Sequence, residues 1–386
     1  MKIAVILNTN KLGGAERSLI EQLKVISHQH EFHFYFPELK TSHSELKEFL
    51  LDKGFTNFDS IRYPFFVYQL SRSNLIGLPI FIMKAPLLVY YLFLWHKIFK
   101  NYSTFYLNGN KACLPVFLWS FFFRKSVSFI WHFRDYPSPK AFTVLGYIFS
   151  KCKRNFKNLT LVANSFAVGK ELTPYFPSVK IITLYNLPGD LPQLPAPESI
   201  ERIGIVAMLA PWKGLHDVLL SIAIHKKELK LLGIKKFTFY GSSIYQTDGV
   251  HKNYEHDLQE LCSKLKLGQF VEFAGLKRPE EIYSQIDLLI HPTLTAEPFG
   301  RVIIEAFKSR RPVISTGIGG AGELVTHEQN GLVYSAYDSA SLFNSLKRLA
   351  QNNEMVTHIT FNAFEKLKIL EEEVKEQIIN LFPPEG

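Results

Sequence analysis

Short apolar runs alternate with helical periods along this chain, and the alternation repeats in both halves. In the first half, an apolar run at residues 3–7 precedes a helical pattern over 16–27 and a second run at 32–36. In the second half, the run 203–209 precedes a helical pattern that ends near residue 225. Apolar strands that alternate with helices build parallel sheets from βαβ units. The chain is therefore predicted to be α/β, with a parallel sheet in each half.

A proline-rich segment separates the two halves. Residues 186–198 contain four prolines, which remove backbone donors and disfavour helix before them. We predict an N-terminal domain over 1–186, a linker over 187–199, a C-terminal domain over 200–364 and a last helix over 365–386.

Charge and phenylalanine are concentrated in the first half. Residues 1–190 hold 23 lysines and arginines against 11 acidic residues, together with 23 of the 33 phenylalanines. Residues 191–386 hold 21 basic residues against 24 acidic ones. A basic, aromatic half favours an anionic partner such as nucleic acid or a membrane surface. Because no zinc-finger or RRM motif is present, the sequence disfavours nucleic acid.

The cysteines and the N-terminus indicate a cytoplasmic protein. Cys113, Cys152 and Cys262 are odd in number and far apart, so they predict neither a disulfide framework nor a metal site. The first apolar run is too short for the core of a signal peptide. We find no Asp-x-Asp motif and no His/Asp cluster with metal-ligand spacing, so we expect no metal and no cofactor.

Residues 286–334 form one compact pattern. A strand over 286–292 and a loop over 293–300 lead into a helix over 301–310. The next strand, 311–316, leads through the glycine-rich loop 317–322 into a second helix. Both loops thus lie at the carboxyl ends of parallel strands and run into helix N-termini, where ligands and phosphates bind.

Glu297 and Glu305 bracket the first of these helix starts. A carboxylate there can accept hydrogen bonds from the vicinal hydroxyls of a sugar or ribose. The spacing alone is weak evidence, since pairs of glutamates eight apart occur by chance and usually lie on a solvated helix face. The sequence around the two glutamates is what supports a functional role for them.

The string Glu297-Pro-Phe-Gly-Arg-Val-Ile-Ile-Glu305, followed by Arg311-Pro-Val-Ile-Ser and Gly319-Gly-Ala-Gly-Glu323, resembles the signature of glycosyltransferase family 4, the retaining glycosyl transferases group 1. The resemblance implies the GT-B fold, in which two Rossmann-like domains face each other across a cleft. It also implies transfer from a nucleotide-diphosphate sugar with retention of anomeric configuration and without a metal.

The resemblance assigns roles to individual residues. Glu305 would bind the ribose and Glu297 the transferred sugar, while Lys213 matches the lysine that binds the diphosphate. His132 matches a histidine near the donor sugar, although a lone histidine between aromatic residues is more often part of a core. The catalytic residues would then be His132, Lys213 and Glu297. The remaining donor contacts would be Gly13, Gly14, Gly241, Leu276, Phe299, Gly300 and Arg301.

Acceptor contacts are expected from Glu16, Arg134 and Asp135. Glu16 ends the motif Lys11-Leu-Gly-Gly-Ala-Glu16, which resembles the family's first glycine loop; by itself it would be a plain turn. Asn164 and Asn186 resemble family positions that we interpret as structural. The chain departs from the family at Ala207-Met-Leu209, where Gly-Arg-Leu is usual, so one contact to the diphosphate is absent or supplied elsewhere.

The partner expectations follow from composition. Residues 75–99 are strongly apolar, but Lys84, Pro79 and Pro86 interrupt them, which favours helices that touch a membrane surface over a spanning helix. We expect a glycan or polyprenyl-linked acceptor at the inner face of the cytoplasmic membrane, in polysaccharide or glycolipid synthesis. A nucleotide-sugar epimerase and a catalytically weak sugar-nucleotide-binding subunit remain alternatives.

Overall fold

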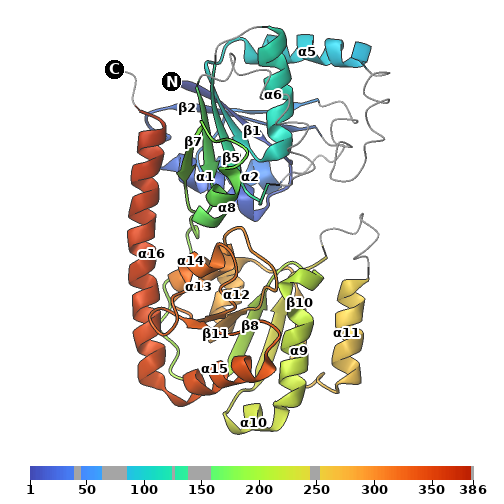
Figure 1. Ribbon diagram of the computed structural model, residues 1–386, viewed down its shortest axis with the longest axis vertical. Coiled ribbons are helices and arrows are strands. Elements are labelled where there is room, and N and C mark those ends of the chain that lie inside the picture. The colour runs from blue at the N-terminus through green and yellow to red at the C-terminus, as the bar shows by residue number, and fades with distance from the viewer. Residues whose placement is uncertain (39–44, 63–84, 124–126, 138–157, 244–252, 384–386) are drawn as a thin grey trace. The chain divides into compact units, whose positions relative to one another are not determined.

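The computed structural model describes residues 1–38, 45–62, 85–123, 127–137, 158–243 and 253–383 (Figure 1). The chain divides into two compact units, Met1–Asn186 with Val374–Gly386, and Leu187–Glu373. Both sheets are wholly parallel within the described residues, which confirms the predicted α/β class. The proline-rich segment 187–199 belongs to the second unit.

Unit 1 is built on a seven-stranded sheet in the order β3-β2-β1-β4-β5-β6-β7. Its strands are β1 (Lys2–Leu7), β2 (Glu31–Pro37), β3 (Phe58–Ile61), β4 (Thr104–Asn108), β5 (Ser128–Phe133), β6 (Leu159–Ala163) and β7 (Lys180–Thr183). Its helices are α1 (Gly14–Lys24), α2 (Glu45–Asp52), α5 (Ala85–Phe99), α6 (Asn110–Phe122) and α8 (Phe166–Leu172).

Aromatic side chains fill one face of the unit 1 sheet. Trp95 of α5 and Trp119 of α6 are buried with Trp131 of β5 and Phe105 of β4 in a single cluster. Such side chains remove large apolar areas from water, about 25 cal/mol for each Å². Much of the phenylalanine enrichment in the first half therefore serves the core, and only its exposed remainder is available to a partner.

Unit 2 is built on a six-stranded sheet in the order β10-β9-β8-β11-β12-β13. Its strands are β8 (Arg202–Val206), β9 (Lys236–Tyr240), β10 (Val271–Gly275), β11 (Leu288–His291), β12 (Val313–Ser315) and β13 (Leu332–Val333). Its helices are the 3₁₀ turn η1 (Pro211–Lys213), α9 (Leu215–Ile224), α10 (Lys226–Leu231), α11 (Tyr254–Lys264), α12 (Pro279–Gln285), α13 (Arg301–Lys308), α14 (Ala321–Leu324) and α15 (Ser339–Gln351).

The last helix, α16 (Asn353–Leu381), starts well before residue 365 and supplies residues to both units. Val356 and Ile359 pack in the core of unit 2. At its other end, the Phe382 carbonyl lies 3.0 Å from Nε2 of His30, and the Phe382 ring stacks 6.0 Å from that of Tyr106. The helix is therefore anchored at each end in a different unit.

Candidate functional site

Two loops at the carboxyl end of the unit 2 sheet are tied together by backbone hydrogen bonds. The Glu297 amide donates to the Ile318 carbonyl at 3.2 Å, and the Gly320 amide donates to the Glu297 carbonyl at 2.7 Å. A Cβ on Gly320 would lie only 2.3 Å from the Pro298 carbonyl oxygen, so this contact requires glycine. The loops after β11 and β12 therefore form one ledge, as the sequence pattern predicts.

Glu305 is held from two sides within α13. Gly300 caps the helix in the left-handed region, with φ of 94°, and Glu305 follows one and a half turns later. Nε of Arg301 lies 3.0 Å from one carboxylate oxygen of Glu305, and the Tyr283 hydroxyl donates to the other at 3.1 Å. The same hydroxyl lies 2.9 Å from the Val302 carbonyl oxygen, so its single proton faces two acceptors. The side chain is only 7% exposed, so these partners fix its orientation.

The structure changes the sequence interpretation at two residues near Glu305, Tyr283 and Phe299. Tyr283 was missed because a tyrosine on α12, far along the chain, carries no motif. Phe299 is 2% exposed, so it is buried inside unit 2, and its role toward a donor stays a prediction.

Lys213, Glu297 and His291 meet beside Glu305's helix. The Lys213 ammonium pairs with Oε2 of Glu297, and Nε2 of His291 lies 3.8 Å from the same oxygen. Burial alone would raise the pKa of Glu297, but the charge of Lys213 and the hydrogen bond that it donates bring the pKa below its ordinary value. The site thus holds an ionised carboxylate and an ammonium in a place that largely excludes water.

The loops after β8 and β9 pack closely together. The Gly241 amide donates to the Gly275 carbonyl at 2.8 Å, and a Cβ on Gly241 would lie 1.9 Å from the Ala207 carbonyl oxygen. Gly241 is therefore needed for packing, and its amide is already engaged. Leu276, at the end of β10, is exposed. Their roles toward a donor stay predictions.

Glu16 is enclosed at the first glycine loop of unit 1. Gly13 caps α1 without a side chain, and a Cβ there would lie 2.9 Å from Oε2 of Glu16. Burial raises the pKa of Glu16, against the lowering effect of backbone hydrogen bonds and of Arg134. Gly14 is exposed at the start of the helix. The loop thus carries a buried carboxyl that favours its proton.

Arg134 connects the ends of several strands. Its Nε donates to Oδ1 of Asn108 at 2.8 Å, and one terminal nitrogen donates to Oδ1 of Asn186 at 2.7 Å. Asn164 donates to the Arg134 carbonyl at 3.1 Å. Asparagine at the carboxyl end of a strand is the signal that could have indicated this network. Asp135, the other expected acceptor contact, is exposed.

His132 lies inside unit 1. It is 0% exposed, and the Tyr106 hydroxyl lies 2.5 Å from its Nδ1. Burial, reinforced by the charge of Arg134, lowers its pKa well below the ordinary value, so the ring is neutral. In this conformation no atom of the ring reaches the surface, and its role toward a donor sugar stays a prediction.

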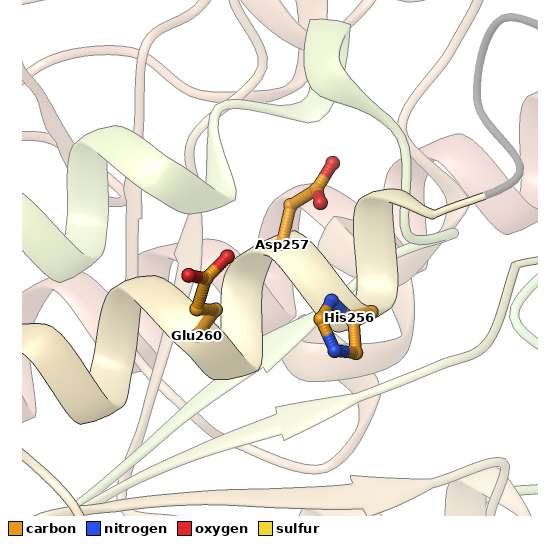
Figure 2. A group of neighbouring side chains, drawn as sticks. All are labelled: His256, Asp257 and Glu260. Carbon is orange, nitrogen blue, oxygen red and sulfur yellow. The ribbon is translucent and has the colours of Figure 1, made fainter.

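A group of three possible metal ligands lies on α11 (Figure 2). His256, Asp257 and Glu260 are all exposed, and Figure 2 shows them along one stretch of the helix. The Glu260 carboxylate already pairs with Lys264 at 2.7 Å. A cation there would compete with an ammonium and with water, so these residues carry no metal assignment.

None of the helices that the structure describes combines the length and the apolar character required to cross a bilayer. Residues 63–84, which include the first ten residues of the strongly apolar stretch 75–99, lie outside the described residues, and the rest of that stretch forms α5. The same holds for Cys152.

Comparison with known proteins identifies the second half of the chain. Residues 190–366 match the family described as glycosyl transferases group 1. A D-inositol 3-phosphate glycosyltransferase of Corynebacterium urealyticum is 29% identical over 161 residues, which cover 41% of this chain and 37% of that protein. An uncharacterized glycosyltransferase of Methanocaldococcus jannaschii is 32% identical over 222 residues, 56% of this chain and 51% of that protein.

Solved structures resemble the whole chain. Anabaena HepE, in complex with UDP and glucose, superposes with a TM-score of 0.75 at 21% identity and covers 99% of both chains. TarM superposes with a TM-score of 0.74 at 13% identity and covers 99% of this chain and 98% of that one. At these identities the likeness establishes the fold. Residues 190–366 are thus similar to the glycosyl transferases group 1 family, and the chain has the GT-B fold of two parallel-sheet, Rossmann-like units.

Proposed function

We propose that this protein transfers a sugar from a nucleoside diphosphate sugar to an acceptor hydroxyl. The observation that carries the proposal is the grouping of Glu305, Glu297 and Lys213 on the ledge at the carboxyl end of the unit 2 sheet. The similar HepE structures are complexes with UDP and glucose and with UDP-glucose, which supports UDP as the nucleotide here. The proposed donor is therefore a UDP-sugar.

Each group on the ledge has a chemical task in this proposal. The Glu305 carboxylate accepts hydrogen bonds from the ribose hydroxyls. Lys213 and the N-terminus of α13 offset the charge that develops on the departing diphosphate, so we propose that no divalent metal is needed. Glu297 accepts a hydrogen bond from a hydroxyl of the transferred sugar.

The reaction breaks the bond from the anomeric carbon to the diphosphate and forms a bond from that carbon to the acceptor oxygen. We propose that the departing diphosphate takes up the proton of the acceptor hydroxyl. Retention of anomeric configuration is supported by the resemblance of the Glu297–Glu305 string to retaining enzymes.

The test is nucleotide binding followed by transfer. Thermal shifts with UDP, GDP, ADP and their glucose derivatives should single out one nucleotide. Lys213→Met and Glu305→Ala should weaken its binding, whereas Lys264→Met, an exposed lysine of the same unit, should not. Stabilisation of the wild type by none of these nucleotides would reject the proposal. Interconversion of the free nucleotide sugar without transfer would instead support an epimerase.

We also propose that unit 1 touches an anionic membrane through α5 and α6, at the inner face of the cytoplasmic membrane. Tyr90 and Phe93 of α5 and Phe121 and Phe122 of α6 are exposed. The two helices lie side by side (Figure 1), and the Phe93 ring lies 6.0 Å from that of Phe123. Exposed aromatic rings of this kind suit the interface of a bilayer.

The charge of the same segment agrees with such a surface. Residues 85–123 contain three lysines and no aspartate or glutamate. Basic residues near an anionic surface add about 1 kcal/mol each to binding. A membrane partner in turn favours a lipid-linked glycan, such as a polyprenyl-linked one, as acceptor.

Vesicle co-sedimentation tests the membrane proposal. Phe93→Ser should reduce binding to vesicles that contain anionic lipid by about threefold or more, because an exposed ring at the interface is lost. The control is Phe361→Ser, since Phe361 is 63% exposed and Phe93 is 60% exposed. Equal losses from both substitutions, or binding that ignores lipid charge, would contradict the proposal.

A further inference from the structure

His291 lies beneath the ledge, although no motif singles it out. It is the last residue of β11 and is 3% exposed. Its register partner on β12 is Ser315, whose Oγ lies 3.2 Å from Nδ1 of the ring. The other ring nitrogen, Nε2, lies 3.8 Å from Oε2 of Glu297. The imidazole therefore stands between the sheet and the carboxylate of Glu297.

The contacts at the two ends of the ring favour one tautomer of His291. The Gly317 amide donates to Oγ of Ser315 at 3.1 Å, which leaves the hydroxyl hydrogen of Ser315 available to Nδ1 of His291. In the tautomer that suits both contacts, the ring proton is on Nε2 and faces the Glu297 carboxylate. The opposite tautomer would place a lone pair against that anion. Burial lowers the pKa of His291 to about 4, so the ring is neutral at physiological pH.

Lys213 contacts the same oxygen of Glu297. In the proposed reaction, its ammonium also offsets the negative charge of the diphosphate. A diphosphate carries more charge than one carboxylate, so it draws the ammonium toward itself. Glu297 would then lose the charge of Lys213 while it stays largely buried, and a buried carboxylate is stabilised by every hydrogen-bond donor that faces it. The Nε2–H group of His291 is a donor that faces this carboxylate and does not move with Lys213.

We propose that His291 is a positioning residue that holds the Glu297 carboxylate in place for the transferred sugar when Lys213 turns to the diphosphate. The inference rests on the proposed function, because it needs a donor with both a diphosphate and a sugar. In this proposal, different residues recognise the two parts of the donor. Loss of His291 affects recognition of the sugar and leaves recognition of the nucleoside diphosphate unchanged.

Two substitutions at His291 test the roles of the two ring nitrogens separately. The side-chain amide of His291→Gln reaches the place of Nε2 and restores a donor toward Glu297. The shorter amide of His291→Asn reaches only the place of Nδ1, beside Ser315. We expect UDP affinity, measured by titration calorimetry, to change less than twofold in both variants. UDP-glucose affinity and kcat should fall about tenfold or more in His291→Asn and within threefold in His291→Gln.

Equal behaviour of the two variants would overturn the inference, as would a loss of UDP affinity as large as that of UDP-glucose. Nitrogen-15 NMR of the histidine-labelled, full-length protein adds a test that needs no nucleotide. The signals that disappear in His291→Gln should report the Nε2–H tautomer, and an Nδ1–H tautomer would overturn the inference. Failure of the wild type to bind any nucleotide would reject the proposed function, and the NMR result would still decide the orientation of the ring.

Discussion

Replacement of Lys213 by methionine tests, without any ligand, how much the ion pair of Lys213 and Glu297 contributes to stability. The side chains of Lys213 and Glu297 are 15% and 18% exposed, so their pairing takes place largely out of water. The backbone of Glu297 is fixed by hydrogen bonds of 3.2 and 2.7 Å to Ile318 and Gly320, which limits how far the carboxylate can move toward solvent. Lys213→Met therefore leaves a confined anion behind.

The magnitude follows from this asymmetry. Removal of one partner from a buried ion pair costs about 3–5 kcal/mol, and the partial exposure here favours about 3 kcal/mol for Lys213→Met. Glu297→Gln should cost only about 1 kcal/mol, because the long lysine side chain can reach water. The double variant should then be more stable than Lys213→Met alone, by about 1–2 kcal/mol, since no unbalanced charge remains.

Hydrogen exchange of the amides in β8 and β11 measures the opening free energy at the sheet of unit 2. The loss in Lys213→Met should shrink as pH falls from 7 to 5, because burial then raises the pKa of Glu297 and the carboxyl is protonated. Additive effects of the two substitutions within about 0.5 kcal/mol would refute the reasoning, since they would show that the pair is not coupled.

Three further predictions concern single residues. Glu305→Ala should abolish transfer and reduce nucleotide affinity, with the fold retained by circular dichroism; full activity would contradict its role. Gly320→Ala should destabilise the protein by about 1–3 kcal/mol, because its Cβ would press on the Pro298 carbonyl; Gly268→Ala, whose Cβ meets no neighbour within 4 Å, is the control for thermal unfolding. Because the native pKa of Glu16 is raised above 4.5, its contribution to stability is lost as pH rises from about 4.5 through the native value. Glu16→Gln should therefore gain stability over the wild type between pH 5 and pH 8, and a constant difference in melting temperature would contradict this.

The sequence was sufficient for the fold class and for the ledge. Apolar runs define strands because a buried strand must be apolar on both faces of a parallel sheet. The run 3–7, for example, lies within β1. The glycine loops and helix starts around Glu297 and Glu305 were also predicted, because glycine and helix caps act over a few residues. The helix after Gly300 ends at Lys308, before the expected residue 310, where Arg310 turns into the left-handed region.

Contacts between distant segments were decided only by the tertiary structure. His132 and Arg134 are two residues apart, yet one is enclosed against Tyr106 and the other joins Asn108 to Asn186. The strand order of the sheet, which places β4 beside β5, brings these partners together, and no local pattern encodes that order. Tyr283 and His291 illustrate the same limit, because their importance comes from the side chains that packing places against them. The sequence by itself thus determined the periodicity of the elements and the chemistry of the loops. Only the packed sheets decided which carboxylates are buried and which donors hold them, since burial and pKa depend on neighbours that are far apart along the chain.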